Sequence, residues 1–217
     1  MGQPLRVGQL ARGHRDRITQ ILDATRVFRP EEVEVALELF DETFPADGAR
    51  SNDILASPDS TVYRLPSTDC GSTDYRLPST DCSTTAHRLP PTACSYAFLG
   101  AFTPEDELVG YACYGPTPDT DRTFDLYWIA VDPGAQGSGS GTRLLTEVER
   151  RLQGQNARML IVETSSRSEY ASTRHFYEKR GYAEAARVRE FYAPLDDRII
   201  FTKRFHSPEG GERCSNE

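Results

Sequence analysis

The sequence predicts one α/β domain of the α+β type, and three observations lead to this fold class. The chain has 217 residues, which fits one domain with an insertion and suffices to bury a sizeable core. Runs with strand or helix periodicity follow in a mixed order: strand, helix, helix, three strands, helix, strand, helix, two strands. The link at residues 103–107, TPEDE, is short and turn-like, which predicts an antiparallel hairpin.

The chain before residue 45 is expected to hold one strand, at 5–11, and two helices. Residues 15–25 place Ile18 and Leu22 at helical spacing, and Pro30 followed by two glutamates is the start signal of the second helix. The second helix presents one apolar face, formed by Val33, Leu37, Phe40 and Phe44. Its remaining surface is acidic and carries Glu31, Glu34, Glu38, Asp41 and Glu42. These carboxylates either attract a cationic substrate or form an ordinary solvated helix surface.

Residues 51–95 have the composition of an inserted loop. The block YRLPSTDC starts at Tyr63 and again at Tyr75, and a third copy, HRLPPTAC, starts at His87. Each repeat offers one Leu and one aromatic or His side chain, too little apolar surface to offset the entropy of ordering it. We therefore expect a surface loop that is largely disordered and arose by tandem duplication. Single cysteines at this spacing do not form the close pairs typical of a metal site, so no metal is expected.

The elements after the insertion follow from apolar periodicity and turn residues. We expect strands at 96–102, 108–115, 124–131, 158–164, 186–194 and 198–205, and helices at 141–152 and 169–181. Gly181 is the expected C-terminal stop of the last helix. The resulting organisation is a single domain over residues 1–206, with the loop 51–95 inserted and 207–217 as a disordered tail.

Charge and hydropathy exclude several classes of function. The net charge of −8, without a basic stripe, argues against nucleic-acid binding. No stretch approaches the ~18 consecutive apolar residues of a membrane span, and the first residues lack the apolar core of a signal peptide. We expect a cytoplasmic protein whose five cysteines, none in a C-x-x-C pair, are free thiols.

The most informative stretch is VDPGAQGSGSGTRLL, residues 131–145, which joins a strand to a helix. Glycines at a helix N-terminus let backbone N–H groups approach a phosphate closely, and the helix dipole adds to the attraction. The stretch therefore predicts a site for an anionic ligand such as a pyrophosphate. A flexible glycine turn is the alternative.

This stretch resembles the acetyl-CoA loop of the GNAT superfamily of N-acetyltransferases, Gln/Arg-x-x-Gly-x-Gly/Ala, at Gln136, Gly139 and Gly141. RHFYEKRGY, residues 174–182, is similar to the second motif of that family. The resemblance covers about residues 5–44 and 96–205, and residues 51–95 have no counterpart in the family pattern. It implies a mixed, mostly antiparallel sheet flanked by helices that opens between its fourth and fifth strands.

What the resemblance implies is direct transfer of an acetyl group from acetyl-CoA to a primary amine in a ternary complex, without a metal. The pyrophosphate would lie on the N–H groups of Gln136, Gly137, Ser138, Gly139, Ser140, Gly141 and Thr142. The pantetheine arm would follow the strand that ends at Val131. An N–H group of Ile129, Ala130 or Val131 would stabilise the tetrahedral oxyanion.

Two residues are candidates for catalysis by this resemblance. Tyr177 matches the position of a Tyr beside the CoA sulfur, where it acts as general acid or as hydrogen-bond donor to the departing thiolate. An aromatic residue on a packed helix face is the alternative. Glu163 is a candidate base, directly or through water, because an alkyl amine with a pKa of ~10 must lose a proton. A carboxylate that only binds substrate or caps the next loop is equally compatible with the sequence.

The acceptor side is less defined. Asp125, Tyr127 and Tyr192 are candidates for substrate binding. The alternative is that these side chains take part in ordinary strand packing or are exposed to solvent. His175 is expected at a solvated helix position and Cys113 as a core thiol. We favour a small-molecule amine, while an amino acid, an antibiotic and a protein amino terminus stay open.

Two other functions compete with acetyl transfer. A dinucleotide-dependent oxidoreductase would use the same glycine cluster, but the spacing provides no G-x-G-x-x-G and the hairpin opposes an all-parallel sheet. A non-catalytic CoA-binding module would use the repeat loop to recruit a partner, although the repeats contain no P-x-x-P.

Overall fold

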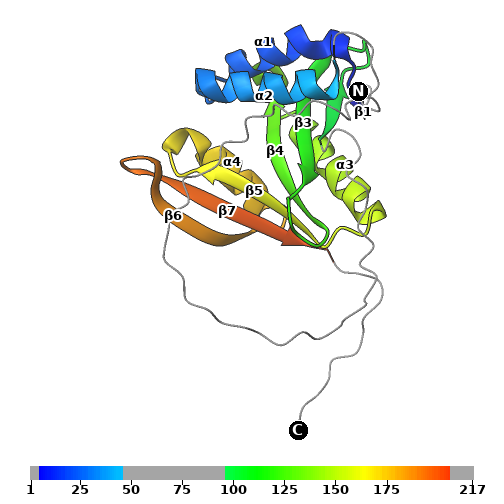
Figure 1. Cartoon of the computed structure of the whole chain (residues 1–217). Helices are drawn as coiled ribbons and strands as arrows, with labels where there is room; N and C mark the ends of the chain where they lie inside the picture. The colour runs from blue at the N-terminus through cyan, green and yellow to red at the C-terminus, as the bar shows by residue number, and fades with distance from the viewer. Residues whose placement is uncertain (1–4, 46–95, 206–217) are drawn as a thin grey trace, which may run out of the picture. The chain divides into compact units, whose positions relative to one another are not determined.

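The computed structural model describes residues 5–45 and 96–205 (Figure 1). The expected insertion 51–95 with its repeats, and the expected tail 207–217, lie outside the described residues.

The described elements follow the order expected from the sequence. The strands are β1 (Arg6–Gln9), β2 (Ala97–Phe102), β3 (Leu108–Pro116), β4 (Thr123–Val131), β5 (Met159–Ser165), β6 (Ala183–Ala193) and β7 (Asp196–Arg204). The helices are α1 (Arg15–Thr25), α2 (Pro30–Thr43), α3 (Ser140–Gly154) and α4 (Ala171–Glu178). Short 3-10 turns occupy Arg12–His14, Pro133–Ala135 and Ser168–Tyr170.

Most element boundaries shift by one to three residues from the expectation, and two of these differences have a clear cause. The helix expected at 169–181 divides into the 3-10 turn Ser168–Tyr170 and the shorter α4, after which Gly181 takes a φ of 79°. A left-handed residue of this kind ends a helix, as the sequence suggested. Strand β6 begins at Ala183 rather than at 186, because Ala183 pairs with Thr202 of β7.

The strands form one seven-stranded sheet in the order β1-β2-β3-β4-β5-β7-β6. Every pairing is antiparallel except that of β4 with β5, which confirms the mixed, mostly antiparallel sheet. The parallel pairing runs only from Thr123↔Met159 to Leu126↔Val162, so the second half of β4 has no partner in β5. Figure 1 shows the two strands diverging from there. This gap in the sheet, at the place that the family resemblance implies, positions the site.

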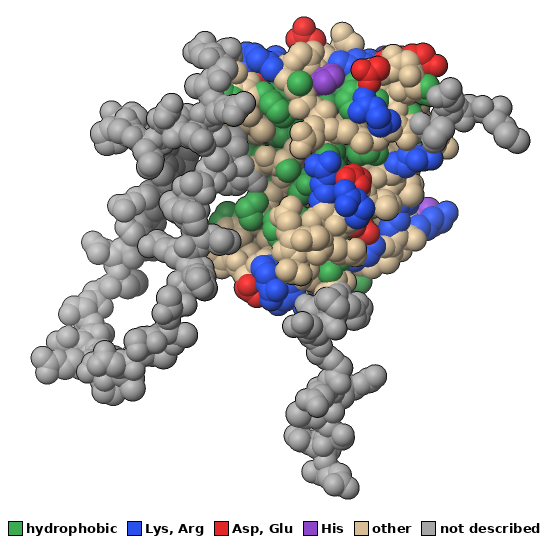
Figure 2. All heavy atoms as spheres, turned by 90° about the vertical axis from the view of Figure 1, so that its right-hand side faces the viewer, with side chains coloured by type: hydrophobic (Ala, Val, Ile, Leu, Met, Phe, Trp, Pro, Cys, Tyr) green, Lys and Arg blue, Asp and Glu red, His purple; other side chains and the backbone are tan. Residues whose placement is uncertain are grey.

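Helices pack on both faces of the sheet. Helices α1 and α2 bury Ile18, Leu22 and Phe40 against Phe98 and Tyr111. On the other face, α3 and α4 cover the sheet with a second apolar core that includes Leu144, Leu145, Leu152, Tyr177, Ile199 and Phe201. On the side of the molecule shown in Figure 2, basic and acidic side chains lie interspersed.

Candidate active site

The glycine-rich turn between β4 and α3 has a defined backbone conformation. Asp132 accepts a hydrogen bond from the Gly134 N–H at 2.8 Å, and Arg17 of α1 donates to the same carboxylate at 2.8 Å. Gly137 and Gly139 have φ values of 78° and 90°, which favour glycine because a side chain there is strained. The turn is therefore bent at two glycines and tied by hydrogen bonds at its start.

Unpaired backbone N–H groups lie in the turn and at the start of α3. The N–H groups in the first turn of a helix have no intrahelical partner, and the positive end of the helix dipole lies there. Four N–H groups of the turn are already engaged. Gly134 donates to the Asp132 carboxylate and Ala135 to the Asp132 carbonyl, both at 2.8 Å, while Gln136 donates to Pro133 at 3.3 Å and Ser138 to Ala135 at 3.4 Å. The remaining N–H groups of the turn and of the first helical turn suit an anionic ligand.

These residues line a cavity of about 650 Å³, called here the larger cavity. Its wall includes nine of the ten residues expected to bind the cofactor, namely Ile129, Ala130, Val131, Gln136, Gly137, Gly139, Ser140, Gly141 and Thr142. Ser138 is not part of the wall, and its hydroxyl donates to the Ala135 carbonyl instead. The expected cofactor residues are thus brought together, apart from one side chain that stabilises the turn.

Tyr177 of α4 also lines the larger cavity, although only 3% of its surface is exposed. Its ring packs against Phe176 and Tyr182, with centroid distances of 5.3 and 5.5 Å. Burial raises the pKa of Tyr177, so its phenol stays protonated and can donate a hydrogen bond. Tyr177 therefore packs against other aromatic rings and also lies on the cavity wall, so its position is compatible with both interpretations from the sequence.

Arg180 is a residue of the larger cavity that the sequence analysis missed. Its guanidinium carbon lies 3.7 Å from the centre of the Phe176 ring, and its terminal nitrogens donate to the Phe176 carbonyl and to the Thr142 hydroxyl. Its Nε is buried and has no hydrogen-bond partner among the described residues. Arg180 belongs to the quoted motif RHFYEKRGY, but only the fold shows that it reaches the first turn of α3.

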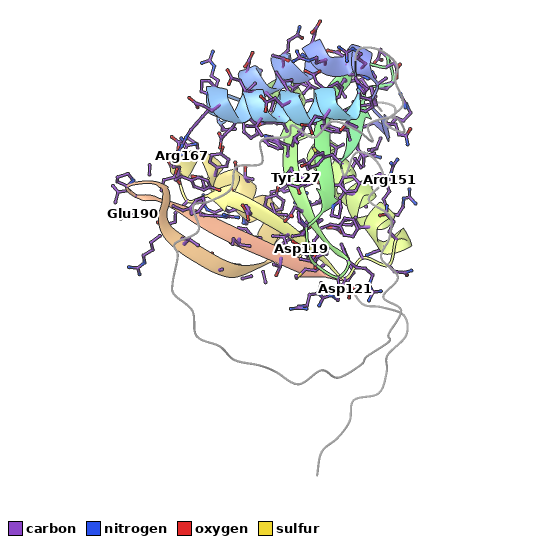
Figure 3. All side chains as sticks on the ribbon, in the orientation of Figure 1. Asp119, Asp121, Tyr127, Arg151, Arg167 and Glu190 are labelled. Carbon is purple, nitrogen blue, oxygen red and sulfur yellow. The ribbon has the colours of Figure 1, made fainter. Side chains whose placement is uncertain are left out.

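A second cavity of about 410 Å³, the smaller cavity, adjoins the first. The two share seven wall residues: Phe28, Leu126, Tyr127, Trp128, Glu163, Thr164 and Tyr170. All four acceptor-side candidates, Asp125, Tyr127, Glu163 and Tyr192, line the smaller cavity. Figure 3 shows Tyr127 on β4, in the space between the helix pair α1–α2 and the strands β5 and β7. The two cavities therefore border the same residues of β4 and β5, where these strands part.

Glu163 lies at the junction of the cavities and forms an ion pair with Arg198 of β7. The carboxylate of Asp125 accepts a hydrogen bond from the Thr117 hydroxyl at 2.7 Å. Burial raises the pKa of Asp125, while Thr117 and Arg198 oppose this shift. Burial also raises the pKa of Tyr127 to about 12, with the nearby Asp125 charge as a smaller contribution. The junction thus combines two carboxylates, one guanidinium and a neutral phenol.

Three further charged residues on or under the wall were not anticipated: Arg29, Arg167 and Asp196. Asp196 is 3% exposed and accepts hydrogen bonds from the Ser165 hydroxyl and from Arg29, the latter at 3.1 Å. Arg167 lies 3.5 Å from the same carboxylate. No local pattern marks these residues, since Arg29 and Asp196 are 167 positions apart in the chain.

The acidic surface of α2 largely faces away from the smaller cavity. Glu32 is the one α2 carboxylate on its wall, and it accepts a hydrogen bond from the Arg29 N–H at 2.7 Å. Asp41 instead pairs with Arg15 of α1 at 2.7 Å, which lowers the pKa of Asp41. The geometry supports a solvated helix surface rather than a substrate guide.

The other candidate groups lie outside the cavities. His175 is exposed and lies 3.6 Å from Glu178 on the same helix. Cys113 is fully buried, and burial raises the pKa of its thiol. Within residues 5–45 and 96–205, no cluster of His, Cys, Asp or Glu has the geometry of a metal site. None of the helices described is long and apolar enough to cross a membrane.

Comparison with known proteins decides the family. The model of the acetyltransferase (GNAT) family matches residues 62–182, from just before the first repeat to the end of the second motif. The chain belongs to this family. A Desulfovibrio desulfuricans protein assigned to the same family has a structure that superposes with a TM-score of 0.67 at 33% identity, covering 93% of this chain and 99% of its own. No curated protein matches the sequence.

Two N-acetyltransferase structures of lower sequence identity show similarity of the fold alone. The ribosomal-protein-S18-alanine N-acetyltransferase of Escherichia coli superposes with a TM-score of 0.60 at 14% identity, covering 95% of this chain and 98% of its own. An N-acetyltransferase of Staphylococcus aureus Mu50 gives 0.58 at 10% identity, covering 93% and 99%. Because the chain belongs to the acetyltransferase (GNAT) family, the protein is an acetyl-CoA-dependent acetyltransferase, and the oxidoreductase alternative is wrong.

Proposed function

We propose that this GNAT protein acetylates a primary amine of a small molecule by direct transfer in a ternary complex. The observation that carries the proposal is the junction of the two cavities, with Tyr177 on one side and Glu163 in the shared wall. Acetyl-CoA would occupy the larger cavity and the amine the smaller one. Direct transfer needs no acyl-enzyme, and the buried Cys113 thiol with its raised pKa is a poor nucleophile.

The residues of the larger cavity fit acetyl-CoA. The free N–H groups of Gly137, of Gly139 and of the first turn of α3 would hold the pyrophosphate, with the Arg180 guanidinium beside them. A Cβ built at Gly137 or Gly139 would have no neighbouring atom within contact distance. The backbone of the turn is therefore open to a ligand at these two glycines. Because β4 has no partner in β5 after Leu126, its later residues present an unpaired strand edge to the pantetheine arm.

The same strand edge would serve the reaction itself. Ile129, Ala130 and Val131 line the larger cavity, and an N–H group among them would donate to the thioester oxygen. Transfer forms a C–N bond and breaks the C–S bond, and the sulfur leaves as thiolate. The ammonium loses one proton before it attacks, and its nitrogen loses a second after the C–N bond forms, which passes to solvent or to the departing thiolate. The Tyr177 phenol, kept neutral by burial, would donate a hydrogen bond to that sulfur.

Glu163 would receive the proton of the amine, directly or through one water molecule. Its carboxylate borders both cavities, and the ion pair with Arg198 fixes its position there. Asp125, Tyr127 and Tyr192 would contact the acceptor from the wall of the smaller cavity.

We also propose that residues 1–206 form a single domain into which 51–95 are inserted, followed by a tail at 207–217. The described residues on both sides of the insertion complete the sheet and both apolar cores without it. In the chain, the insertion stands between α2 and β2, before the strands and helices that line the larger cavity's glycine-rich turn.

Ligand-induced stabilisation followed by a CoA-release assay tests the function. Acetyl-CoA at a hundred times its dissociation constant should stabilise the fold by ~2.7 kcal/mol, and NAD should not. Amines should then release CoA, and Tyr177→Phe should lower kcat about a hundredfold while acetyl-CoA still stabilises the protein. The control is Tyr182→Phe, because the Tyr182 hydroxyl donates to Glu149 and lines neither cavity. Stabilisation without release of CoA for any amine would support the non-catalytic alternative.

A further inference from the structure

The charged residues of the smaller cavity form two groups with opposite surplus charge. The first group, called here the arginine group, consists of Arg29, Arg167 and the buried Asp196. The second, the carboxylate group, consists of Asp125, Glu163 and Arg198. Each group contains one unbalanced charge, and both belong to the same cavity.

In the arginine group, two guanidinium groups share one carboxylate. Arg29 and Arg167 reach Asp196 at 3.1 and 3.5 Å, so one positive charge is left over. Ser165 occupies the other oxygen of Asp196, and the buried carboxylate therefore fixes both guanidinium groups on the cavity wall. Figure 3 shows Arg167 below α2, where the β5 half of the sheet approaches the helix pair.

Glu32 is the one carboxylate that could cancel this surplus from α2. It occupies the third position of the helix and accepts the N–H group of Arg29 at 2.7 Å. The positive end of the α2 dipole offsets a carboxylate in this position. The guanidinium groups thus keep a net attraction for an anion.

In the carboxylate group, Arg198 balances only one of two acidic side chains. It pairs with Glu163 and lies close enough to Asp125 to affect its pKa. The Nε of Arg198 is buried without a partner in the described part of the chain, and its guanidinium stacks 4.8 Å from the centre of the Phe191 ring. A cation placed between Asp125 and Glu163 would complete the charge balance.

We infer that the acceptor is an amino carboxylate, a small amine that carries its own carboxylate group. Its ammonium group would face Asp125 and Glu163, next to the larger cavity, and its carboxylate would bind Arg29 and Arg167. Planar guanidinium groups bind carboxylates through paired hydrogen bonds, which gives such a site both strength and orientation. The inference rests on the proposed acetyl transfer and narrows its acceptor class.

The test compares each amino carboxylate with the amine that lacks its carboxylate. Suitable pairs are L-phenylalanine with 2-phenylethylamine, L-lysine with cadaverine, and 4-aminobutyrate with propylamine, all measured as CoA release at equal concentrations of free amine. In at least one pair the carboxylate form should have a kcat/KM about 10 to 100 times higher, the effect of one or two charged hydrogen bonds. Arg29→Gln and Arg167→Gln should each reduce this ratio to about one.

The ratio is read within a single enzyme preparation, so a variant that is partly unfolded still reports it correctly. Arg150→Gln is the matched control, because Arg150 is an exposed residue of α3 that pairs with Glu147. Equal rates within every pair, or a ratio that survives both cavity variants, would overturn the inference and leave acetyl transfer intact. Release of CoA with none of the amines would overturn the inference and the proposed function together.

Discussion

The larger and the smaller cavity lie side by side on β4, but their walls are made differently. The larger cavity takes much of its wall from one continuous stretch, residues 129–142, and offers backbone N–H groups at the start of α3. The smaller cavity collects side chains from the α1–α2 connection, β4, β5 and the β6–β7 hairpin, and offers three arginines and three carboxylates.

This difference determines how each cavity responds to substitution. A site built from backbone N–H groups loses little when one side chain is shortened, and is damaged mainly by changes that alter the backbone conformation. A site built from charged side chains loses an interaction with each residue, and leaves the partner charge without its counterion. The variants below test this contrast, from the largest expected effect to the smallest.

The largest effect is expected at the junction, for Glu163→Gln. Removal of the base should lower kcat about a hundredfold at pH 7 and less at higher pH, because the fraction of free amine rises toward its pKa of ~10. The raised pKa values mean that Tyr127, at about 12, and Tyr177 both remain protonated in this range. The wild-type rate should therefore increase with pH without a fall below pH 10.

The matched control for this variant is Glu178→Gln, an exposed residue of α4. If Glu163→Gln raises the KM for the amine and leaves kcat unchanged, the carboxylate binds substrate and is not the base. That outcome would move Glu163 from the catalytic step to acceptor recognition.

An intermediate effect is expected for Gly139→Ala. The φ of 90° strains any side chain, at a cost of about 1 to 2 kcal/mol, so the turn should shift and bind acetyl-CoA more than about tenfold more weakly. Calorimetric titration with CoA provides the measurement. Gly154→Ala, in the last turn of the same helix and without close neighbours, should retain binding and slightly increase stability. Equal binding by the two variants would show that the turn tolerates a side chain.

The smallest effect is expected for Arg180→Gln, which removes a charged side chain that lines the larger cavity and contacts Thr142 of α3. It should weaken CoA binding about five- to tenfold, in keeping with the loss of one charged hydrogen bond. Dephospho-CoA, which lacks the 3′-phosphate, distinguishes two contacts. A smaller loss with dephospho-CoA assigns Arg180 to the 3′-phosphate, and an equal loss assigns it to the pyrophosphate.

Arg143→Gln serves as the control for Arg180→Gln. Arg143 follows Thr142, the residue that Arg180 contacts, but its guanidinium donates to the Leu5 carbonyl. Unchanged affinity of Arg180→Gln for both ligands would show that its stacking on Phe176 is purely structural.

The two cavities also differ in how far the sequence predicts them. Gln136, Gly139 and Gly141 mark the larger cavity within six residues, and its helix follows at once. Arg180 stands in a recognised motif, but its contact with Thr142, 38 positions away, depends on the packing of α4 against α3. In the smaller cavity, Asp125, Tyr127, Glu163 and Tyr192 were predicted as separate candidates, and nothing in the sequence indicated that Arg29, Arg167 and Asp196 would join them.

The sequence by itself determined the order of strands and helices, the glycine-rich turn between β4 and α3, and the family. Each of these depends on residues that are close together in the chain. Periodicity, a helix-start proline and glycines at a strand–helix junction act over a few residues. The tertiary structure alone decided that β4 and β5 part after Leu126, which arginines face the gap, and that Glu163 belongs to the walls of both cavities. These features arise from strand register and helix packing between distant segments, and the burial of Asp196 exists only once those segments are in place.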